Sequence, residues 1–305
     1  MSIYTKNFIH RYDKDGIVPY LSNKDFSGLK KIEKSFINSN NDQIAFFWYS
    51  YDHYNKDKVV LFLHGIGPGH TAYLREINEL CQKGYRVLTL DYTGCDKSSG
   101  ESLKSLNEPT KDANELLNYL NLKEEVIVVG HSLGGYTTLN LLNLRRNITK
   151  AVIMAGFISI KCEVKALTKL PFFPLSIKNY EKKKCVGYNN LDNLTFLKNT
   201  TDKILFIQSV DDQLVPFKSA TGFIRETISN SNLSFIIEES KNHNPNYTVE
   251  AVKYMNDTFK DYHLKIKKHI LKTFEEKQNY MKEKSAFEMT SQDESVWSKI
   301  FEFIK

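Results

Sequence analysis

Hydrophobic and polar residues follow two different patterns in the first part of the chain. Residues 31–39 and 43–51 alternate between polar and apolar, which predicts two strands of an antiparallel edge. Residues 59–63 are apolar without interruption and run into His64-Gly65. A continuous run of this kind is typical of a strand that is buried on both faces of a sheet. The pattern therefore predicts an antiparallel edge attached to a buried parallel interior.

Further along the chain, apolar runs alternate with helical patterns. We expect strands at 85–90, 125–129, 151–154, 204–208 and 233–237, and helices at 71–83, 109–120, 133–145 and 216–229. Strands that alternate with helices form right-handed crossovers, which produce a parallel sheet covered on both faces. The prediction is a single α/β domain over residues 1–305, with about eight mostly parallel strands.

Two long segments interrupt this alternation. Residues 158–201 are too many for a simple crossover, and we expect them to form a small cap over the carboxyl ends of the strands. Residues 247–290 read as a helical insert before the last helix. An apolar stripe in this insert has spacings of three and four, and we expect it to pack as core: Met255, Phe259, Tyr262, Ile266 and Ile270. Ser291 and Glu294 form a capping-box pattern that predicts the start of a final amphipathic helix.

The strongest candidate for chemistry is the Gly-x-Ser-x-Gly pattern centred on Ser132. It follows the expected strand 125–129 and precedes a helical pattern. At such a corner a sharp backbone turn exposes the serine hydroxyl, and the glycines avoid collisions with neighbouring backbone. Ser132 is therefore the predicted nucleophile.

A serine nucleophile needs a base and a group that orients the base. Asp211 and Asp212 follow the expected strand 204–208, and His243 follows the expected strand 233–237. Both loops leave the carboxyl ends of parallel strands, where the active sites of open α/β sheets collect. The order Ser, Asp, His predicts a catalytic triad with His243 as base and one of the two aspartates as its partner.

The oxyanion of such a reaction needs two backbone N–H donors. One is expected from Leu133, directly after the nucleophile, and the other from the glycine-rich loop 64–69. An alternative interpretation makes this loop a phosphate cradle. It fails in detail, because His70 stands where the dinucleotide pattern needs glycine and no Lys-Ser or Lys-Thr follows.

With these motifs, the chain resembles the α/β-hydrolase family over most of its length. The resemblance is closest to the branch with monoacylglycerol-lipase-like, cinnamoyl-esterase-like and prolyl-aminopeptidase-like members. It implies that the acid is Asp212, which stands four residues before Pro216, and that Ile66, after His64-Gly65, gives the second oxyanion amide. The loop 94–98 departs from the family pattern, since it lacks the usual histidine and one glycine. The implied activity is hydrolysis of short-to-medium acyl or aryl carboxylic esters through an acyl-enzyme, without cofactor or metal.

Composition adds few constraints. The chain has 41% apolar and 26% charged residues and four scattered cysteines without metal-ligand spacing. It shows no long apolar run and no leader-like beginning, so we expect a cytoplasmic protein. No nucleic-acid-binding motif is present, and the expected partner is a small-molecule ester.

The formal net charge of +6 is concentrated in the expected cap. Between residues 161 and 184 there are seven lysines against Glu163 and Glu181. We expect these lysines to face water. The alternatives are that they attract anionic or lipid-like esters or contact a membrane surface, as in a lipid-surface lipase, and that the chain is a low-turnover binding protein with a hydrolase fold. The apolar segment 170–175 is expected to pack the cap onto the sheet rather than to line a substrate pocket.

Overall fold

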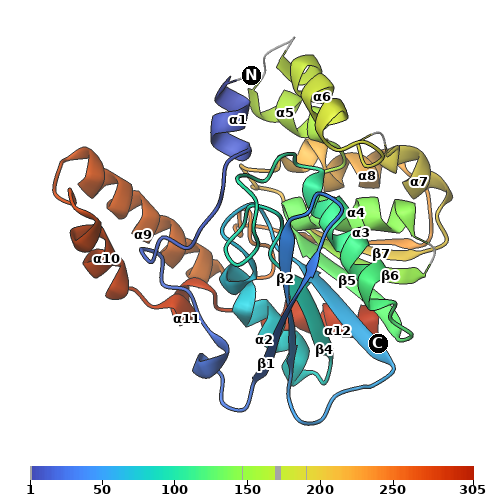
Figure 1. Cartoon of the computed structure of the whole chain (residues 1–305), viewed down its shortest axis with the longest axis horizontal. Coiled ribbons are helices and arrows are strands. Elements are labelled where there is room, and N and C mark those ends of the chain that lie inside the picture. Colours follow the sequence, from blue (N-terminus) through green and yellow to red (C-terminus); the bar gives the residue numbers. More distant parts are fainter. Residues whose placement is uncertain (1, 146, 169–172, 190) are drawn as a thin grey trace.

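The fold is known from a computed structural model, which describes residues 2–145, 147–168, 173–189 and 191–305, without the side chains of residues 2, 3, 149, 165–168 and 173–175. Figure 1 shows a central sheet with helices on both faces, a group of helices at the top and a helical arm that extends to one side. The side chains of the apolar segment 170–175, which we expect to pack the cap onto the sheet, are outside the described part of the chain. Within the described part of the chain, no helix combines the length and the apolar character needed to cross a bilayer.

The sheet has eight strands in the order β1-β2-β4-β3-β5-β6-β7-β8. Only β2 runs against its neighbours, and all other neighbouring pairs are parallel. This confirms the predicted mostly parallel sheet with an antiparallel edge. The strands are β1 (Lys30–Ile37), β2 (Gln43–Ser50), β3 (Lys58–Leu63), β4 (Arg86–Leu90), β5 (Glu125–His131), β6 (Ile148–Met154), β7 (Lys203–Ser209) and β8 (Leu233–Glu238).

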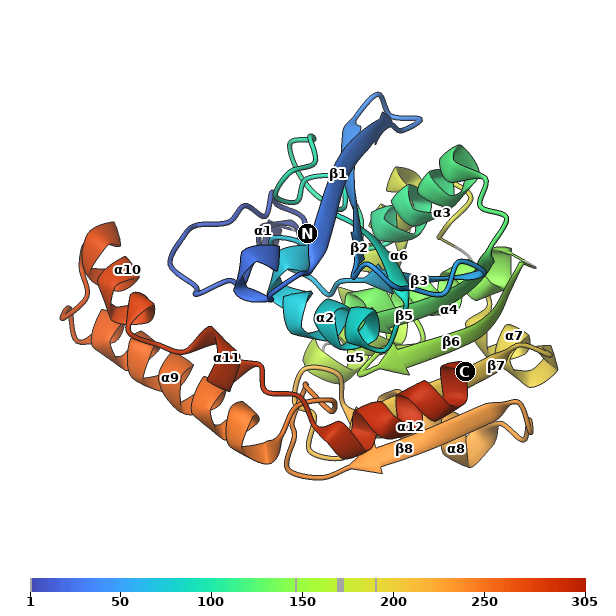
Figure 2. The ribbon, with the colours of Figure 1, turned by 90° about the horizontal axis from the view of Figure 1, so that it is seen from below.

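Successive side chains of a strand point to opposite faces, so the apolar runs supply two cores. One core lies under α3 (Glu108–Leu120), α4 (Leu133–Leu144), α7 (Asn193–Asn199) and α8 (Thr221–Thr227), and contains Leu61, Val128 and Ile153. The other lies under α2 (Leu74–Gln82) and α12 (Glu294–Ile304) and contains the neighbouring residues Phe62, Val129 and Val152. Figure 2 shows α2 and α12 on one side of the sheet and α3 and α4 on the other. This two-sided burial explains why strands β3, β5 and β6 read as continuous apolar runs.

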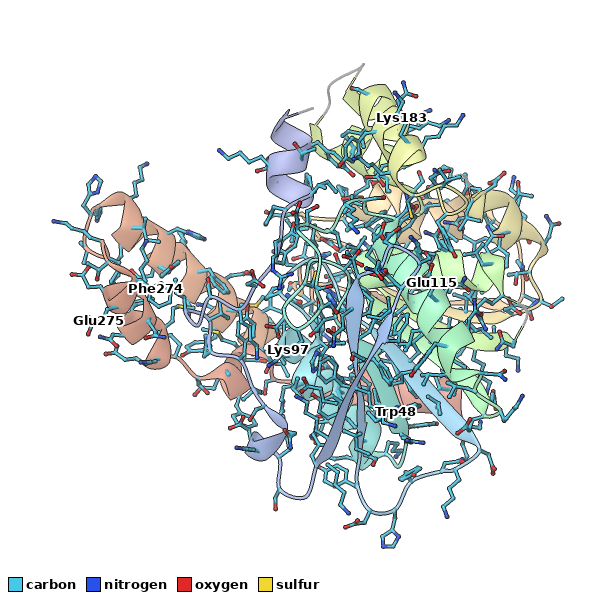
Figure 3. All side chains as sticks on the ribbon, in the orientation of Figure 1. Trp48, Lys97, Glu115, Lys183, Phe274 and Glu275 are labelled. Atoms are coloured by element: carbon cyan, nitrogen blue, oxygen red, sulfur yellow. The ribbon has the colours of Figure 1, made fainter. Side chains whose placement is uncertain are left out.

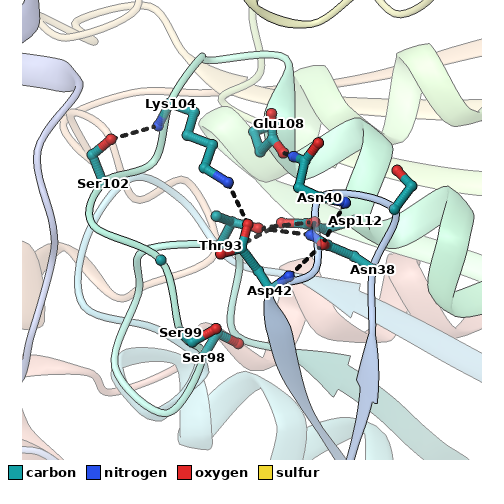
Figure 4. Close-up of polar contacts among 12 residues, drawn as sticks. Asn38, Asn40, Asp42, Thr93, Ser98, Ser99, Ser102, Lys104, Glu108 and Asp112 are labelled. Carbon is teal, nitrogen blue, oxygen red and sulfur yellow. Dashed lines mark hydrogen bonds and ion pairs between the residues drawn. The ribbon is translucent and has the colours of Figure 1, made fainter.

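A buried polar network joins the β1–β2 turn to the long loop between β4 and α3. Asn38 donates hydrogen bonds to Thr93 Oγ1 (3.2 Å) and Asp112 Oδ1 (3.0 Å), and Lys104 forms an ion pair with Asp42 (Figure 4). Asp112 also accepts a 2.7 Å hydrogen bond from the Thr93 amide. Every strong donor and acceptor named here has a partner, so the network can be buried without a large desolvation cost. It fixes the loop that later contributes Leu106 to the candidate site.

Three helices from distant parts of the sequence form the roof of the molecule. They are α1 (Ser2–Phe8), α5 (Ile160–Thr168) and α6 (Phe173–Lys184), which lie together above the sheet in Figure 1. The buried carboxylate of Glu181 on α6 holds the roof together: it accepts hydrogen bonds from the hydroxyl of Tyr4 (2.6 Å) and the amide group of Asn107 (2.9 Å) and from the hydroxyl of Ser105. The roof is thus tied to the chain below through this carboxylate and through the hydroxyl of Tyr180 on α6, which donates a hydrogen bond to the carbonyl of Lys104 (3.1 Å).

The helical arm consists of α9 (Val249–Lys267), α10 (Phe274–Lys282) and α11 (Ala286–Met289). Its apolar stripe does not pack as core in the way the spacing predicts. Met255 and Phe259 line a cavity of about 280 Å³ between the arm and the segments 18–21 and 71–75, whereas Ile270 is 55% exposed. The stripe faces the body only near the base of the arm, because the arm leaves the sheet and extends into solvent (Figures 1 and 2).

Two other details differ from the sequence predictions. The expected helix 216–229 is divided into a 3₁₀ turn, Phe217–Ser219, and α8, because Ala220 between them has φ −124° and ψ −113°. The last helix is capped by Asp293 rather than Ser291, and Asp293 accepts hydrogen bonds from the amides of Ser295 and Val296. The carbonyl of Ser291 instead accepts a hydrogen bond from the amide of Thr248 at the base of the arm.

Candidate active site

The loops that follow β3, β5, β7 and β8 meet at the carboxyl edge of the sheet. In the sheet order, the connections from β3 and β5 leave in opposite directions, which opens a crevice at this point. A cavity of about 380 Å³ lies there under the roof. It is lined by Tyr4, Phe8, Ile66, Tyr73, Leu106, His131, Ser132, Leu133, Phe157, Ile160, Glu163, Val164, Leu214, Val215, His243 and Asn244.

Ser132 occupies the corner between β5 and α4 and has the conformation that the sequence pattern predicts. Its φ of 57° and ψ of −117° are strained for a residue with a side chain. The turn is possible because Gly130 and Gly134 approach other backbone closely: a Cβ on Gly134 would lie 2.0 Å from the carbonyl oxygen of Leu63. The tight packing of these glycines against the neighbouring strand presents Ser132 at the cavity wall.

The structure brings His243 and Asp212 together across two strands. Nδ1 of His243 lies 2.9 Å from Oδ2 and 3.1 Å from Oδ1 of Asp212. The Asp212 carboxylate also accepts hydrogen bonds from the amides of Leu214 and Val215, both at 2.9 Å, and its side chain has no exposed surface. These donors fix the carboxylate, so that it can orient the imidazole and stabilise its protonated form. His243 lines the same cavity as Ser132.

Asp211, the other candidate for the acid, points elsewhere. Its carboxylate accepts hydrogen bonds from the hydroxyl of Ser209 and, at 3.2 Å, from the amide of Asn242. It thus shapes the loops on both sides, whereas Asp212 contacts the imidazole of His243. The geometry favours the acid that the family resemblance implies.

His131, next to the serine, belongs to a hydrogen-bonded chain that the sequence did not predict. Its Nε2–H donates to the carbonyl oxygen of His243 (2.7 Å), since a carbonyl can only accept. Its Nδ1 accepts from the hydroxyl of Tyr73 (3.0 Å), which in turn accepts from the amide of Gly65 (3.1 Å). Burial, and then the nearby His243, lowers the pKa of His131 to about 3 and keeps it neutral. The chain connects the glycine-rich loop after β3 to the loop that holds the candidate base.

The two expected oxyanion residues, Ile66 and Leu133, both line the cavity beside Ser132. The alternative interpretation of their loop as a phosphate cradle is contradicted by its surroundings. The Asp91 carboxylate lies against Gly69, where an added Cβ would be 2.4 Å from its Oδ1, and it accepts a hydrogen bond from the amide of His70 (2.9 Å). A buried carboxylate at this position would repel a phosphate group.

Among the described residues that line the cavity, Glu163 is the one with a carboxyl group. It lies on α5 in the roof, it is 9% exposed, and its side chain forms no hydrogen bond with any residue that the structure describes. Burial, with a smaller contribution from Asp212, raises its pKa to about 8. A lone glutamate in a lysine-rich segment gave no signal in the sequence that it would face the cavity.

The thiol of Cys95, the other candidate nucleophile, is not among the residues that line this cavity. Burial raises the pKa of the Cys95 thiol well above its ordinary value, so Cys95 is protonated and unreactive. Across the described ranges, no three His, Cys, Asp or Glu side chains are arranged to hold a metal ion.

The sheet order, the strained serine between β5 and α4, and the Asp–His pair after β7 and β8 together define an α/β-hydrolase. Comparison with known families is more specific: the model of the serine aminopeptidase S33 family matches residues 54–228. The chain belongs to this family of hydrolases.

Individual relatives agree with this class. A 2-hydroxy-6-oxononadienedioate/2-hydroxy-6-oxononatrienedioate hydrolase of Escherichia coli is 32% identical over 108 residues, which are 33% of this chain and 36% of the relative. The chain thus matches about a third of the length of this curated relative. The resemblance of the fold extends much further. An esterase of Pyrococcus furiosus superposes with a TM-score of 0.57 at 18% identity, covering 86% of this chain and 97% of its own. Est1E of Butyrivibrio proteoclasticus, solved with ferulic acid bound, has a TM-score of 0.57 at 16% identity and covers 77% and 98%.

Proposed function

We propose that the protein hydrolyses carboxylic esters with short-to-medium acyl or aryl groups, with Ser132 as nucleophile, His243 as base and Asp212 as the acid that orients it. The observation that carries this proposal is that Ser132 and His243 line one cavity, with the His243 imidazole hydrogen-bonded to a fully buried carboxylate. The walls of that cavity are mostly apolar side chains, which suit the acyl or aryl part of an ester.

The proposed reaction has two halves. Oγ of Ser132 attacks the ester carbonyl carbon while Nε2 of His243 takes the hydroxyl proton, and the amides of Ile66 and Leu133 donate to the resulting oxyanion. The tetrahedral species collapses, His243 returns the proton to the leaving alcohol, and the acyl group remains on Ser132. Water, deprotonated by His243, then attacks the acyl-enzyme, and the carboxylic acid leaves as Oγ regains its proton.

The direct test is turnover of a chromogenic short-chain ester such as p-nitrophenyl butyrate by the wild type and by Ser132→Ala. We expect turnover to fall on the order of 10⁶-fold, as for a serine nucleophile removed from a triad. A variant that keeps wild-type turnover would refute the assignment. If the wild type hydrolyses the ester no faster than the variant, although circular dichroism shows that it is folded, the result would instead favour a binding protein.

The acyl preference follows from a series of p-nitrophenyl esters from acetate to palmitate. A cavity of about 380 Å³ lies near the lower end of the range for small-molecule sites. We therefore expect kcat/KM to rise from acetate to medium chains and to fall for palmitate.

A second candidate function, a lipase that acts at a lipid surface, is favoured by the end of the helical arm. Ile270 and Phe274 lie in and beside the turn between α9 and α10, and each is 55% exposed. Exposed lysines lie near them in the chain, Lys267, Lys268 and Lys272, together with the exposed Glu275 and Glu276. Figure 3 shows Phe274 on this arm, away from the sheet. Apolar side chains among lysines are suited to contact with an anionic membrane surface.

Co-sedimentation with vesicles of anionic and of zwitterionic lipids tests this second function. If the arm binds a lipid surface, the wild type sediments with anionic vesicles, high salt weakens the binding, and Ile270→Ser with Phe274→Ser abolishes it. Equal recovery in the supernatant with and without vesicles would contradict it. The double variant should hydrolyse water-soluble esters at the wild-type rate, because neither residue lies near the cavity.

A further inference from the structure

The cavity under the roof contains two polar side chains for which the proposed reaction has no use, Glu163 and Asn244, and Glu163 is the more buried of the two. Ser132 and His243 carry out the chemistry, and Tyr73 and His131 are occupied by the chain that runs from Gly65 to the His243 carbonyl. Tyr4 donates its hydroxyl proton to Glu181. Glu163 has no such partner among the described residues.

A carboxyl group that is mostly withdrawn from water and has no protein hydrogen-bond partner is costly to place there. Glu163 is nine-tenths buried, and its neighbours in the cavity wall are apolar: Phe157, Ile160 and Val164. A ligand that enters the cavity can supply the missing partner. The free energy of this hydrogen bond is then available to distinguish one ligand from another.

The charge state of Glu163 decides which partner fits. Burial and, to a smaller extent, the like charge of Asp212 raise the pKa of Glu163 to about 8, so the neutral acid is its main form at neutral pH. The helix α5 also packs against α6 and the turn Phe217–Ser219. The other ionisable residues of the cavity wall are Tyr4, Tyr73, His131 and His243. Those of the two packed elements are Lys178, Tyr180, Glu181, Lys182, Lys183 and Lys184 on α6 and Lys218 in the turn. Lys178, Lys182, Lys183 and Lys184 are exposed on α6, and Lys183 points away from the body in Figure 3. Among the residues whose side chains are described, no lysine lines the cavity wall itself.

We propose that Glu163 is a specificity-determining residue, which hydrogen-bonds as a neutral carboxylic acid to an uncharged hydroxyl or carbonyl group on the substrate. The inference rests on the proposed ester hydrolysis and names its substrate class: esters whose apolar acyl or alcohol part carries a second, uncharged oxygen at a distance from the scissile bond. Such an oxygen can accept the carboxyl proton, and a hydroxyl can also donate to the carboxyl oxygen.

A substrate ammonium group is the main rival. It would pair with an ionised Glu163, but both charges would have to leave water for an apolar cavity next to Asp212. A neutral hydroxyl avoids that cost. A substrate carboxylate could accept the proton of Glu163 in a hydrogen bond, but its charge would have to leave water for an apolar cavity near the like charge of Asp212, so it should be the poorest of the three.

The experiment compares matched esters in two arms. In the acyl arm, kcat/KM is measured for four p-nitrophenyl esters of similar length. They are the hexanoate, the 6-hydroxyhexanoate, the 6-ammoniohexanoate and the 5-carboxypentanoate. In the alcohol arm, it is measured for the hexanoate esters of 1-pentanol and 1,5-pentanediol. We expect the hydroxy ester to exceed the plain ester by about tenfold in one of the two arms, as one neutral hydrogen bond allows.

Three variants identify the group responsible. Glu163→Gln keeps a neutral donor and acceptor and should keep the hydroxy preference within about threefold, whereas Glu163→Leu should abolish it. Ile160→Val, on the same helix and in the same wall, should change the rates of all esters by a common factor. In every variant, hydrolysis of the plain hexanoate should be lost when Ser132 is also replaced by alanine. This control tests the proposed function separately from the role of Glu163.

Two results would overturn the proposal. The first is a hydroxy preference that is absent from both arms in the wild type or that survives in Glu163→Leu. The second is a preference for the 6-ammonio ester that Glu163→Gln removes, which would show that Glu163 acts as an anion.

Discussion

The two sides of the cavity are built in different ways. The floor consists of loops that leave the ends of strands β3, β5, β7 and β8, and its polar side chains are held by short hydrogen bonds to neighbouring backbone. The roof consists of three helices, α1, α5 and α6, joined to the rest mainly through the buried carboxylate of Glu181. The floor contains the candidate chemistry in fixed geometry, and the roof contains Glu163, whose side chain has no hydrogen-bond partner among the described residues. This difference suggests that the floor determines the reaction and the roof determines the substrate.

After loss of the nucleophile itself, the largest expected effect comes from loss of the acid in the floor. Asp212→Asn should lower kcat/KM for p-nitrophenyl butyrate by about 10⁴-fold, because the amide cannot stabilise the protonated imidazole in the required orientation. The neighbouring Asp211→Asn is the matched control and should change kcat/KM by less than about tenfold, since Asp211 bonds to Ser209 and Asn242 instead. Equal losses in the two variants would mean that the acid has been assigned wrongly.

A second effect concerns the stability of the floor. Glu76 on α2 lies under the loop of His243, where it accepts a hydrogen bond from Asn246 (3.2 Å), and burial raises its pKa to about 7. The ordinary value is 4.5, so the folded state binds the proton more tightly than the unfolded state. The free energy of unfolding should therefore fall as pH rises from about 4.5 to about 7.

The measurement is urea unfolding of the wild type and of Glu76→Gln at several pH values. We expect the wild type to lose stability, relative to the variant, by on the order of 3 kcal/mol across this window and no more above it. Parallel pH profiles for the two proteins would show that Glu76 does not titrate in this range.

A smaller effect is expected from Tyr73, whose hydroxyl joins Gly65 to His131. Tyr73→Phe removes the hydrogen bonds to the Gly65 amide and to His131, which holds the His243 carbonyl. We expect kcat to fall about tenfold with little change in KM, because the hydroxyl positions His243 and does not bind the substrate. The control in the roof is Tyr180→Phe, which loses a hydrogen bond to the carbonyl of Lys104 and should leave kcat unchanged. A rise in KM without loss of kcat in Tyr73→Phe would instead indicate contact with the substrate.

The smallest effect is expected on the outer surface of the roof. Replacement of Lys182, Lys183 and Lys184 by alanine should change the free energy of unfolding by less than about 0.5 kcal/mol per residue, because all three are exposed. Turnover of a neutral ester should be unchanged. If these lysines attract anionic esters, kcat/KM for an anionic ester should fall with salt in the wild type but not in the triple variant.

The floor could be predicted from the sequence residue by residue, whereas for the roof the sequence predicts only a cap over residues 158–201, and this difference has a physical reason. Strands buried on both faces appear as apolar runs, and a turn as tight as that at Ser132 requires Gly130 and Gly134, so both leave a local signal. The choice of Asp212 over Asp211 came from the family resemblance, since two adjacent aspartates have the same local pattern. The position of Glu163 depends on how α5 folds over the sheet, which no local pattern records. The same holds for the Tyr73–His131 chain, whose members are 58 residues apart.

The claim on which the rest depends is that Ser132 is the nucleophile, and covalent trapping tests it most directly. The protein is incubated with a fluorophosphonate, and its intact mass and the modified peptide are determined. The account predicts one phosphonyl group per chain, on Ser132, with no addition to Ser132→Ala and much slower addition to His243→Ala. Stoichiometric labelling of Ser132→Ala, or of another residue in the wild type, would contradict it.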